Sequence, residues 1–108
     1  MIKATFYKDS SGNHVGFSIS GHAGYAKYGN DIVCSAVSVL VITTINSIEK
    51  LTDNPYKSEV GKSGLIKFKF SSIPDEKGKL LIESLIMGII GIHDEYGDKY
   101  LELYFKEV

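Results

Sequence analysis

The feature that most constrains this fold is a run of twenty mostly apolar residues from Ile32 to Leu51. Its β-branched residues are poor helix formers, but the run is much longer than an ordinary strand, which favours a helix. Apolar side chains fall around most of the circumference of such a helix, so more than one neighbour has to bury it. A sheet would be one neighbour, and a second subunit is a candidate for the other.

Short runs typical of β-strands flank this helix on both sides. Residues 2–8 are rich in Ile, Thr, Phe and Tyr, and residues 15–19 alternate apolar with small or polar side chains after a turn at 9–13. Residues 56–60 and 65–70 form a second pair of this kind. Two pairs joined by short turns predict two antiparallel hairpins.

A second apolar stripe predicts another helix that begins at Pro74, with Ser71 or Ser72 near its N-terminal cap. Gly88 and Gly91 would leave one side of this helix thin enough for another backbone to approach closely. This thin side adds to the expectation of a homodimer.

The last residues, from about 100 to 105, alternate again and predict a final strand. The expected order is ββαββαβ, an α+β fold in which an antiparallel sheet carries both helices on one face. A chain of 108 residues with 44% hydrophobic content can bury one core, so residues 1–108 are expected to form a single domain.

Charge and cysteine content narrow the partners and the compartment. A net charge of −1 argues against a protein held to nucleic acid by charge alone, so direct nucleic-acid binding is not expected. One cysteine cannot form an internal disulfide, and the N-terminus has no signal-peptide pattern, so a cytoplasmic protein is expected. The apolar stretches at 32–45 and 80–92 contain Ser, Thr, Glu or Gly, and we expect no membrane partner.

The single cysteine, Cys34, lies where the first helix is expected to begin. If Asp31 is the N-cap, Cys34 is the third helical residue, near unpaired N–H groups and the positive end of the helix dipole. That position favours a thiolate, and the same N–H groups could hold an oxyanion during acyl transfer. The alternative is a buried structural cysteine, which is common.

A histidine close to that helix start completes a candidate catalytic pair. His22 lies on a glycine-punctuated segment, residues 21–30, that leads into the helix, and it could serve as general base to the thiol. The alternative is an exposed loop histidine. His93, beside Asp94 and Glu95, is better explained by solvated charges at a helix end than by a metal site, so neither a metal nor a cofactor is expected.

Other residues near this pair have two interpretations each. Asp31 could cap the helix or orient the histidine, and capping is favoured. Ser38, one turn after the cysteine, could hydrogen-bond near the site or bond back to the helix. Tyr25 and Tyr28 could stack on substrate side chains or simply pack in the loop.

These residues carry a resemblance to a known family, the ribosomal-processing cysteine proteases called Prp. The matching residues are Gly21-His22-Ala23 followed by Gly29-Asn30-Asp31-Ile32-Val33-Cys34-Ser35-Ala36-Val37-Ser38. The family pattern is G-H-A, a short spacer and G-x-D-I-V-C-A-A-x-S, from which this chain departs by carrying Ser35 in place of the first alanine after the cysteine.

The resemblance implies a function and roles for individual residues. Family members in certain bacteria remove a short N-terminal extension from ribosomal protein L-twenty-seven, cutting after paired aromatic residues, and they form homodimers. Cys34 would be the nucleophile and His22 the base, with Asp31 and Ser38 as helpers. The substrate-binding loop would contain Gly21, Ala23, Gly24, Tyr25, Tyr28 and Gly29.

The alternative function is a non-catalytic ribosome-associated binding module. It would use residues 21–30 and a mildly basic face to hold a ribosomal protein or RNA. That face would contain Lys57, Lys62, Lys67 and Lys69, which a solvated sheet surface explains equally well. The intact pair of His22 and Cys34 favours the enzyme.

Overall fold

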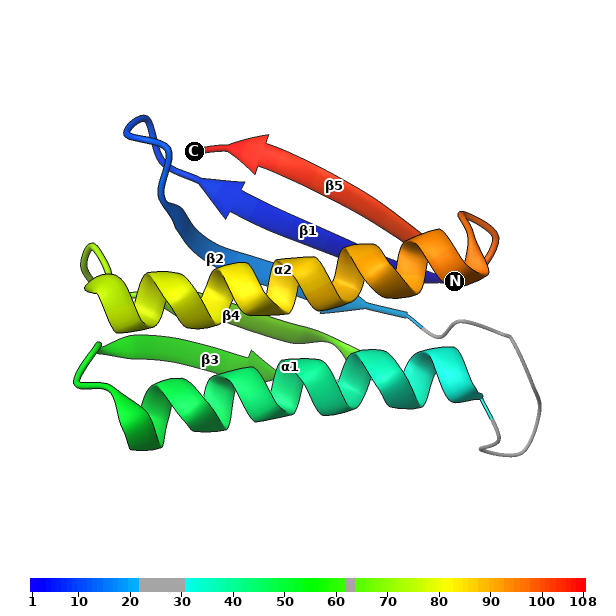
Figure 1. The fold of residues 1–108 in the computed structure, drawn as a ribbon, viewed down its shortest axis with the longest axis horizontal. Helices are drawn as coiled ribbons and strands as arrows, with labels where there is room; N and C mark the ends of the chain where they lie inside the picture. The colour runs from blue at the N-terminus through cyan, green and yellow to red at the C-terminus, as the bar shows by residue number, and fades with distance from the viewer. Residues whose placement is uncertain (22–30, 62–63) are drawn as a thin grey trace.

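The computed structural model describes residues 1–21, 31–61 and 64–108, and its elements follow the expected ββαββαβ order. The strands and helices are β1 (Ile2–Lys8), β2 (His14–Ser20), α1 (Ile32–Leu51), β3 (Tyr56–Val60), β4 (Ile66–Phe70), α2 (Glu76–Tyr96) and β5 (Leu101–Glu107). Both helices lie side by side across one face of the sheet (Figure 1). The α+β class and the placement of both helices on one face are therefore confirmed.

The sheet has the strand order β3-β4-β2-β1-β5 and is mixed rather than wholly antiparallel. Both expected hairpins are antiparallel, and so is the pairing of β2 with β4. The final strand, however, pairs with β1 in parallel. The reason is that α2 carries the chain back along the sheet, so the strands on either side of the helix, β4 and β5, run in the same direction.

The core lies between the sheet and the helices, and strand alternation builds it. In β4 the buried residues Ile66, Phe68 and Phe70 alternate with the exposed Lys67 and Lys69. The opposite strand β2 contributes Phe17, whose ring stacks on that of Phe68 at 5.0 Å between centroids. Period-two alternation thus leaves one sheet face apolar and the other open to solvent.

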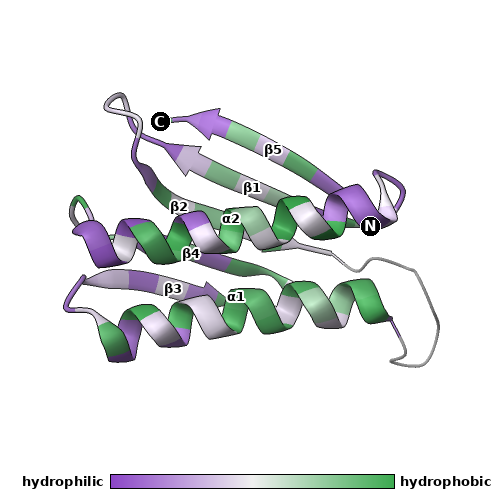
Figure 2. Cartoon of the chain, in the orientation of Figure 1, coloured by the Kyte–Doolittle hydropathy of each residue, from purple (hydrophilic) through white to green (hydrophobic). Residues whose placement is uncertain are grey.

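The inner stripe of α1 closes this core. Val33, Val37, Val41 and Ile48 are at most 2% exposed. By length and composition α1 could also cross a membrane, but a helix that is buried in the core of a folded domain can have the same length and composition. The helix is coloured hydrophobic over much of its length (Figure 2).

One glycine of α2 has a different role from the one expected. A Cβ added to Gly88 would lie 2.8 Å from Cδ1 of Leu40 in α1, so this glycine lets the two helices of one chain approach each other. The expectation that Gly88 thins the helix for a second subunit is therefore wrong. A Cβ at Gly91 would meet open space.

The N-terminus of α2 also differs from the expectation, because Asp75 rather than Ser71 or Ser72 is the cap. Its carboxylate accepts hydrogen bonds from the side chain of Asn54 at 2.7 Å and from the backbone N–H of Gly78 at 2.9 Å. These hydrogen bonds lower the pKa of Asp75, and the one from Asn54 has the largest effect. Aspartate is as good an N-cap residue as serine. The bond from Asn54 also links the start of α2 to the segment that follows α1.

At the other end of α2, His93 contacts the carboxylate of Asp98 in the turn before β5. The hydrogen bond that the His93 ring donates to the Asp98 carboxylate is the main cause of a raised pKa for His93. A raised pKa in the folded state means that the contribution to stability is fully present below pH 6.5 and is lost as the pH rises through the folded-state value.

We therefore expect the melting temperature to fall between pH 6 and pH 8.5 by roughly 2 °C more in the unmodified protein than in His93→Gln. Thermal unfolding followed by circular dichroism at both pH values measures this difference. Parallel curves for the two proteins would show that the contact of His93 with Asp98 contributes nothing to stability.

Candidate active site

The start of α1 fixes the position of Cys34. Asp31 is the N-cap, as expected, and its carboxylate accepts a hydrogen bond from the backbone N–H of Cys34 at 2.9 Å. The cysteine is thus the third residue of the helix, its thiol is free of any disulfide and it is partly exposed. A thiol in the first turn lies near the positive end of the helix dipole.

Asp31 occupies two backbone N–H groups near the thiol that could otherwise bind a substrate oxyanion. The N–H of Cys34 is bonded to the Asp31 side chain, and the N–H of Ser35 donates to the Asp31 carbonyl at 3.0 Å. Neither amide can hold a substrate oxyanion while the cap is in place. Of the unpaired first-turn amides that were expected to hold the oxyanion, that of Cys34 is therefore already engaged by the cap. For the other unpaired amides of the first turn this role stays a prediction.

A small pocket of about 30 Å³ lies beside Cys34. Ser38, predicted to share a helix face with the cysteine, lines this pocket, and so does Gly21. The structure therefore brings Gly21, Cys34 and Ser38 together at this pocket, with Asp31 bonded to the backbone of Cys34. The remaining lining residues are mostly apolar and come from the buried face of the sheet and from α1: Ile2, Ile19, Val37, Val41, Gly64 and Ile66.

Gly21 is held tightly at the edge of this pocket. Its φ is +85°, a conformation that other residues rarely adopt, and a Cβ there would lie 2.2 Å from the carbonyl oxygen of Met1. Residues 22–30 thus lie in the sequence between Gly21, which lines the pocket of Cys34, and Asp31, which caps its helix.

Several predicted site residues fall outside the part of the chain that the structure describes. They are His22, Ala23, Gly24, Tyr25, Tyr28 and Gly29. The other two histidines are engaged elsewhere, since His14 contacts Glu83 of α2 and His93 contacts Asp98. Neither of them lines the pocket beside Cys34.

No pattern in the sequence pointed to Gly64 or to the apolar residues of the pocket as parts of the site. Gly64 has a φ of +74°, and it lies just before β4. The short turn between the predicted strands 56–60 and 65–70, which contains Gly64, was expected only to join them. Its proximity to Cys34 depends on the pairing of β4 with β2, which a pattern within one segment does not reveal.

The two interpretations of Asp31 can be separated by two substitutions. Asp31→Ala removes the cap and should lower the free energy of unfolding by about 1 kcal/mol, whereas Asp31→Asn keeps a good cap and should stay within about 0.5 kcal/mol of the unmodified protein. Urea unfolding measures both values. Peptide cleavage by Asp31→Asn should fall by no more than a few-fold, and a much larger loss at full stability would show that the charge itself serves the reaction.

Comparison with known proteins agrees with this arrangement. The family model "Cysteine protease Prp" matches residues 1–101. A ribosomal processing cysteine protease Prp from Bacillus subtilis (strain 168) is 30% identical over 103 residues, which cover 91% of this chain and 92% of that protein. One from Staphylococcus aureus (strain Mu50) is 23% identical over 107 residues, covering 98% of this chain and all of that protein.

Solved structures share the fold. The crystal structure of SMU.848 from Streptococcus mutans has a TM-score of 0.86 at 32% identity, covering all of this chain and 96% of that one. That of the S. aureus ribosomal processing protease Prp, in complex with a covalently linked product peptide, has a TM-score of 0.91 at 22% identity, covering 97% and 99%. With Cys34 in the first turn of α1 beside a pocket, and with the family model spanning nearly the whole chain, this protein belongs to the Prp family of cysteine proteases.

Proposed function

We propose that this protease removes the N-terminal extension of ribosomal protein L-twenty-seven, cutting after paired aromatic residues, in the cytoplasm. The family membership and the ribosomal-processing names of the B. subtilis and S. aureus relatives support this substrate class. The observation that carries the chemistry is the location of Cys34, in the first turn of a helix and at a pocket.

In this proposal Cys34 is the nucleophile and His22 the general base. The thiolate sulfur attacks the carbonyl carbon of the scissile peptide bond, and the carbon–nitrogen bond then breaks. The imidazole, which has taken the thiol proton, gives it to the leaving amine. Water then hydrolyses the thioester, its proton passing to the imidazole and back to the thiol. The place of Gly21 at the pocket supports this pairing, because His22 follows it directly in the chain.

The remaining predicted residues have supporting roles in the proposal. Asp31 caps the helix that presents the thiol, and Ser38 lines the pocket beside it. The segment 21–30 binds the substrate, with Tyr25 and Tyr28 offering aromatic surface to the aromatic residues of the peptide.

The substrate proposal is tested with the L-twenty-seven precursor of the same organism. After incubation with the protease, mass spectrometry of both fragments should give one cut, directly after the paired aromatic residues. A precursor in which these two residues are replaced by serine is the matched control and should stay intact. Cleavage at another site, or equal cleavage of the control, would contradict the proposed substrate.

We also propose a homodimer, formed through the helix face that points away from the sheet. Val39 of α1 and Met87 of α2 are 64% and 74% exposed, and Ile42 and Leu80 are exposed as well. Exposed apolar side chains concentrated on one layer are typical of a surface that is buried by a partner.

Light scattering tests this proposal. The unmodified protein should have about twice the chain mass of 11.9 kDa at micromolar concentration, and Val39→Glu with Met87→Glu should have the single-chain mass. Val60→Glu, a matched control at an equally exposed position in β3, should leave the dimer intact. A single-chain mass for the unmodified protein would contradict the dimer.

A further inference from the structure

The sheet face that the helices leave uncovered carries more positive charge than the mildly basic face that the sequence suggested. The exposed residues of β4, Lys67 and Lys69, define this outer face, and the register of the strands identifies the others that share it. They include five lysines and two glutamates: Lys3, Lys57, Lys67, Lys69 and Lys106, with Glu59 and Glu102. A chain with a net charge of −1 therefore has one strongly basic face.

Two of these lysines face each other without a compensating carboxylate. Lys57 lies directly opposite Lys69, whereas Lys67 lies opposite Glu59. Like charges opposed across neighbouring strands destabilise a sheet. Within the described part of the chain neither Lys57 nor Lys69 forms an ion pair, so a bound anion would relieve their repulsion.

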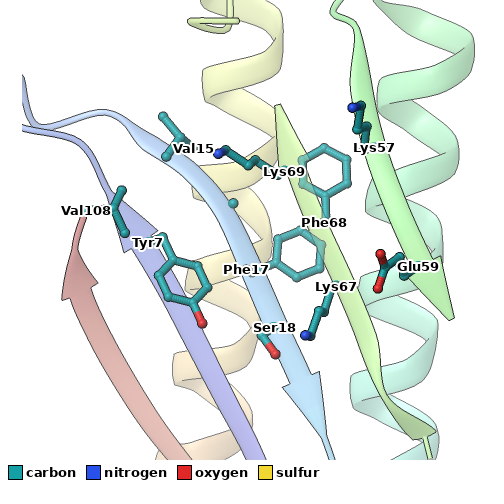
Figure 3. Close-up of a pocket in the computed structure, with 11 residues that line it drawn as sticks. Tyr7, Val15, Phe17, Ser18, Lys57, Glu59, Lys67, Phe68, Lys69 and Val108 are labelled. Atoms are coloured by element: carbon teal, nitrogen blue, oxygen red, sulfur yellow. The ribbon is translucent and has the colours of Figure 1, made fainter. Parts of the chain in front are cut away.

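A trough of about 440 Å³ runs beside this pair, and a second hollow of about 210 Å³ adjoins the same two lysines. Two small residues of the central strand, Gly16 and Ser18, line the trough. The ring of Tyr7 lies at its edge (Figure 3). A Cβ at Gly16 would lie 2.6 Å from the carbonyl oxygen of Phe68, so no larger side chain can fill this space.

An aromatic ring beside lysines on an open sheet matches the needs of one class of ligand. Single-stranded RNA stacks its bases on exposed aromatic side chains while its phosphates contact lysines. An acidic polypeptide would use the lysines but would gain nothing specific from Tyr7. We propose that the outer sheet face binds single-stranded RNA, with a base on Tyr7 and a phosphate between Lys57 and Lys69.

This proposal goes beyond the proteolytic site, because the outer face and the pocket of Cys34 have no lining residue in common. It also revises the expectation drawn from net charge. That expectation used the net charge of the whole chain, whereas strand alternation and register collect five lysines on one face.

Fluorescence anisotropy with a labelled twelve-nucleotide single-stranded RNA tests the proposal on the full chain. About three uncompensated lysines (Lys57, Lys69 and Lys106) predict a loss of affinity of about 20-fold between 50 and 200 mM salt. The double variant Lys57→Gln with Lys69→Gln should weaken binding at least about 10-fold. Lys77→Gln with Lys79→Gln, which removes the same charge from exposed positions of α2, is the matched control and should change it less than about 2-fold.

Two further variants have different purposes. One tests whether the ligand is RNA rather than another anion, and the other tests whether binding can be lost without a loss of stability. Tyr7→Leu should weaken RNA binding by about 10-fold. Lys69→Glu should abolish binding while raising the melting temperature by about 2 °C, because it replaces a like-charge pair with an opposite-charge pair.

Three results would overturn the proposal. The first is no saturable binding of the RNA, and the second is an equal loss of affinity in the α2 control variant. The third is that polyglutamate competes as strongly as unlabelled RNA while Tyr7→Leu binds RNA as tightly as the unmodified protein. The last result would identify the face as a site for acidic protein instead. Cleavage of a peptide substrate by Lys57→Gln with Lys69→Gln should be normal, so the outcome is independent of the proposed protease substrate.

Discussion

Replacing Cys34 with serine should lower peptide cleavage by about 10⁴-fold or more while leaving the fold and peptide binding intact. A serine hydroxyl is far less acidic than a thiol, so the positive end of α1 cannot supply a comparable nucleophile. Serine is close to cysteine in size, and the partly exposed position can accept it without a cavity.

The measurement is single-turnover cleavage of a peptide with paired aromatic residues, followed by liquid chromatography. Ser38→Ala is the matched control on the same helix face, and we expect a loss of no more than a few-fold there, because its hydroxyl lines the pocket without supplying the nucleophile. Substantial cleavage by Cys34→Ser, at more than about one per cent of the normal rate, would remove Cys34 from the reaction.

Gly21→Ala should have the second-largest effect, on both stability and cleavage. Its positive φ alone costs an alanine about 1–2 kcal/mol. The added Cβ would also lie 2.2 Å from the Met1 carbonyl oxygen, so the backbone beside the pocket has to shift. Because His22 is the next residue in the chain, we expect cleavage to fall by at least about 10²-fold.

Gly12→Ala is the matched control for this substitution. Gly12 has a nearly identical φ of +88°, but a Cβ there meets nothing within 4 Å, and the residue lies in the turn between β1 and β2. It should lose about 1 kcal/mol of stability and keep full activity. If Gly21→Ala behaved in the same way, the close contact with Met1 would have no role in positioning the site.

Local patterns were sufficient to predict the elements and one half of the site. Asp31 was favoured as the cap because it directly precedes a long apolar run, and the hydrogen bond to the N–H of Cys34 confirms it. The position of the cysteine in the first helical turn follows from that cap. Both inferences depend only on residues a few positions apart, for which the physics of a helix terminus is sufficient.

Features that depend on distant contacts were not predictable in the same way. The parallel pairing of β5 with β1 arises from the return of the chain through α2, and the role of Gly88 depends on Leu40 in the other helix. The pocket beside Cys34 likewise combines Gly64 with residues of β1, β2 and α1. Alternation shows which side chains are buried, but the register between strands decides which of them meet.

The basic outer face shows the same limit. The lysines of β3 and β4 are visible in the sequence as alternating charges, and a solvated surface explained them equally well. Only the register shows that Lys57 is opposite Lys69 rather than opposite Glu59. A pattern within one strand therefore predicts the face of a side chain, and its partner has to come from the structure.

The most direct test of the central claim is covalent labelling with a peptidyl acyloxymethyl ketone that ends in two phenylalanines. Mass spectrometry of the digested protein should find one adduct, on Cys34, and an excess of the uncleaved substrate peptide should prevent it. His22→Ala should slow the labelling by at least about 10²-fold, because the thiol loses its base. An adduct on another residue, or cleavage of the substrate by a protein whose Cys34 is fully labelled, would contradict the assignment of Cys34 as the nucleophile.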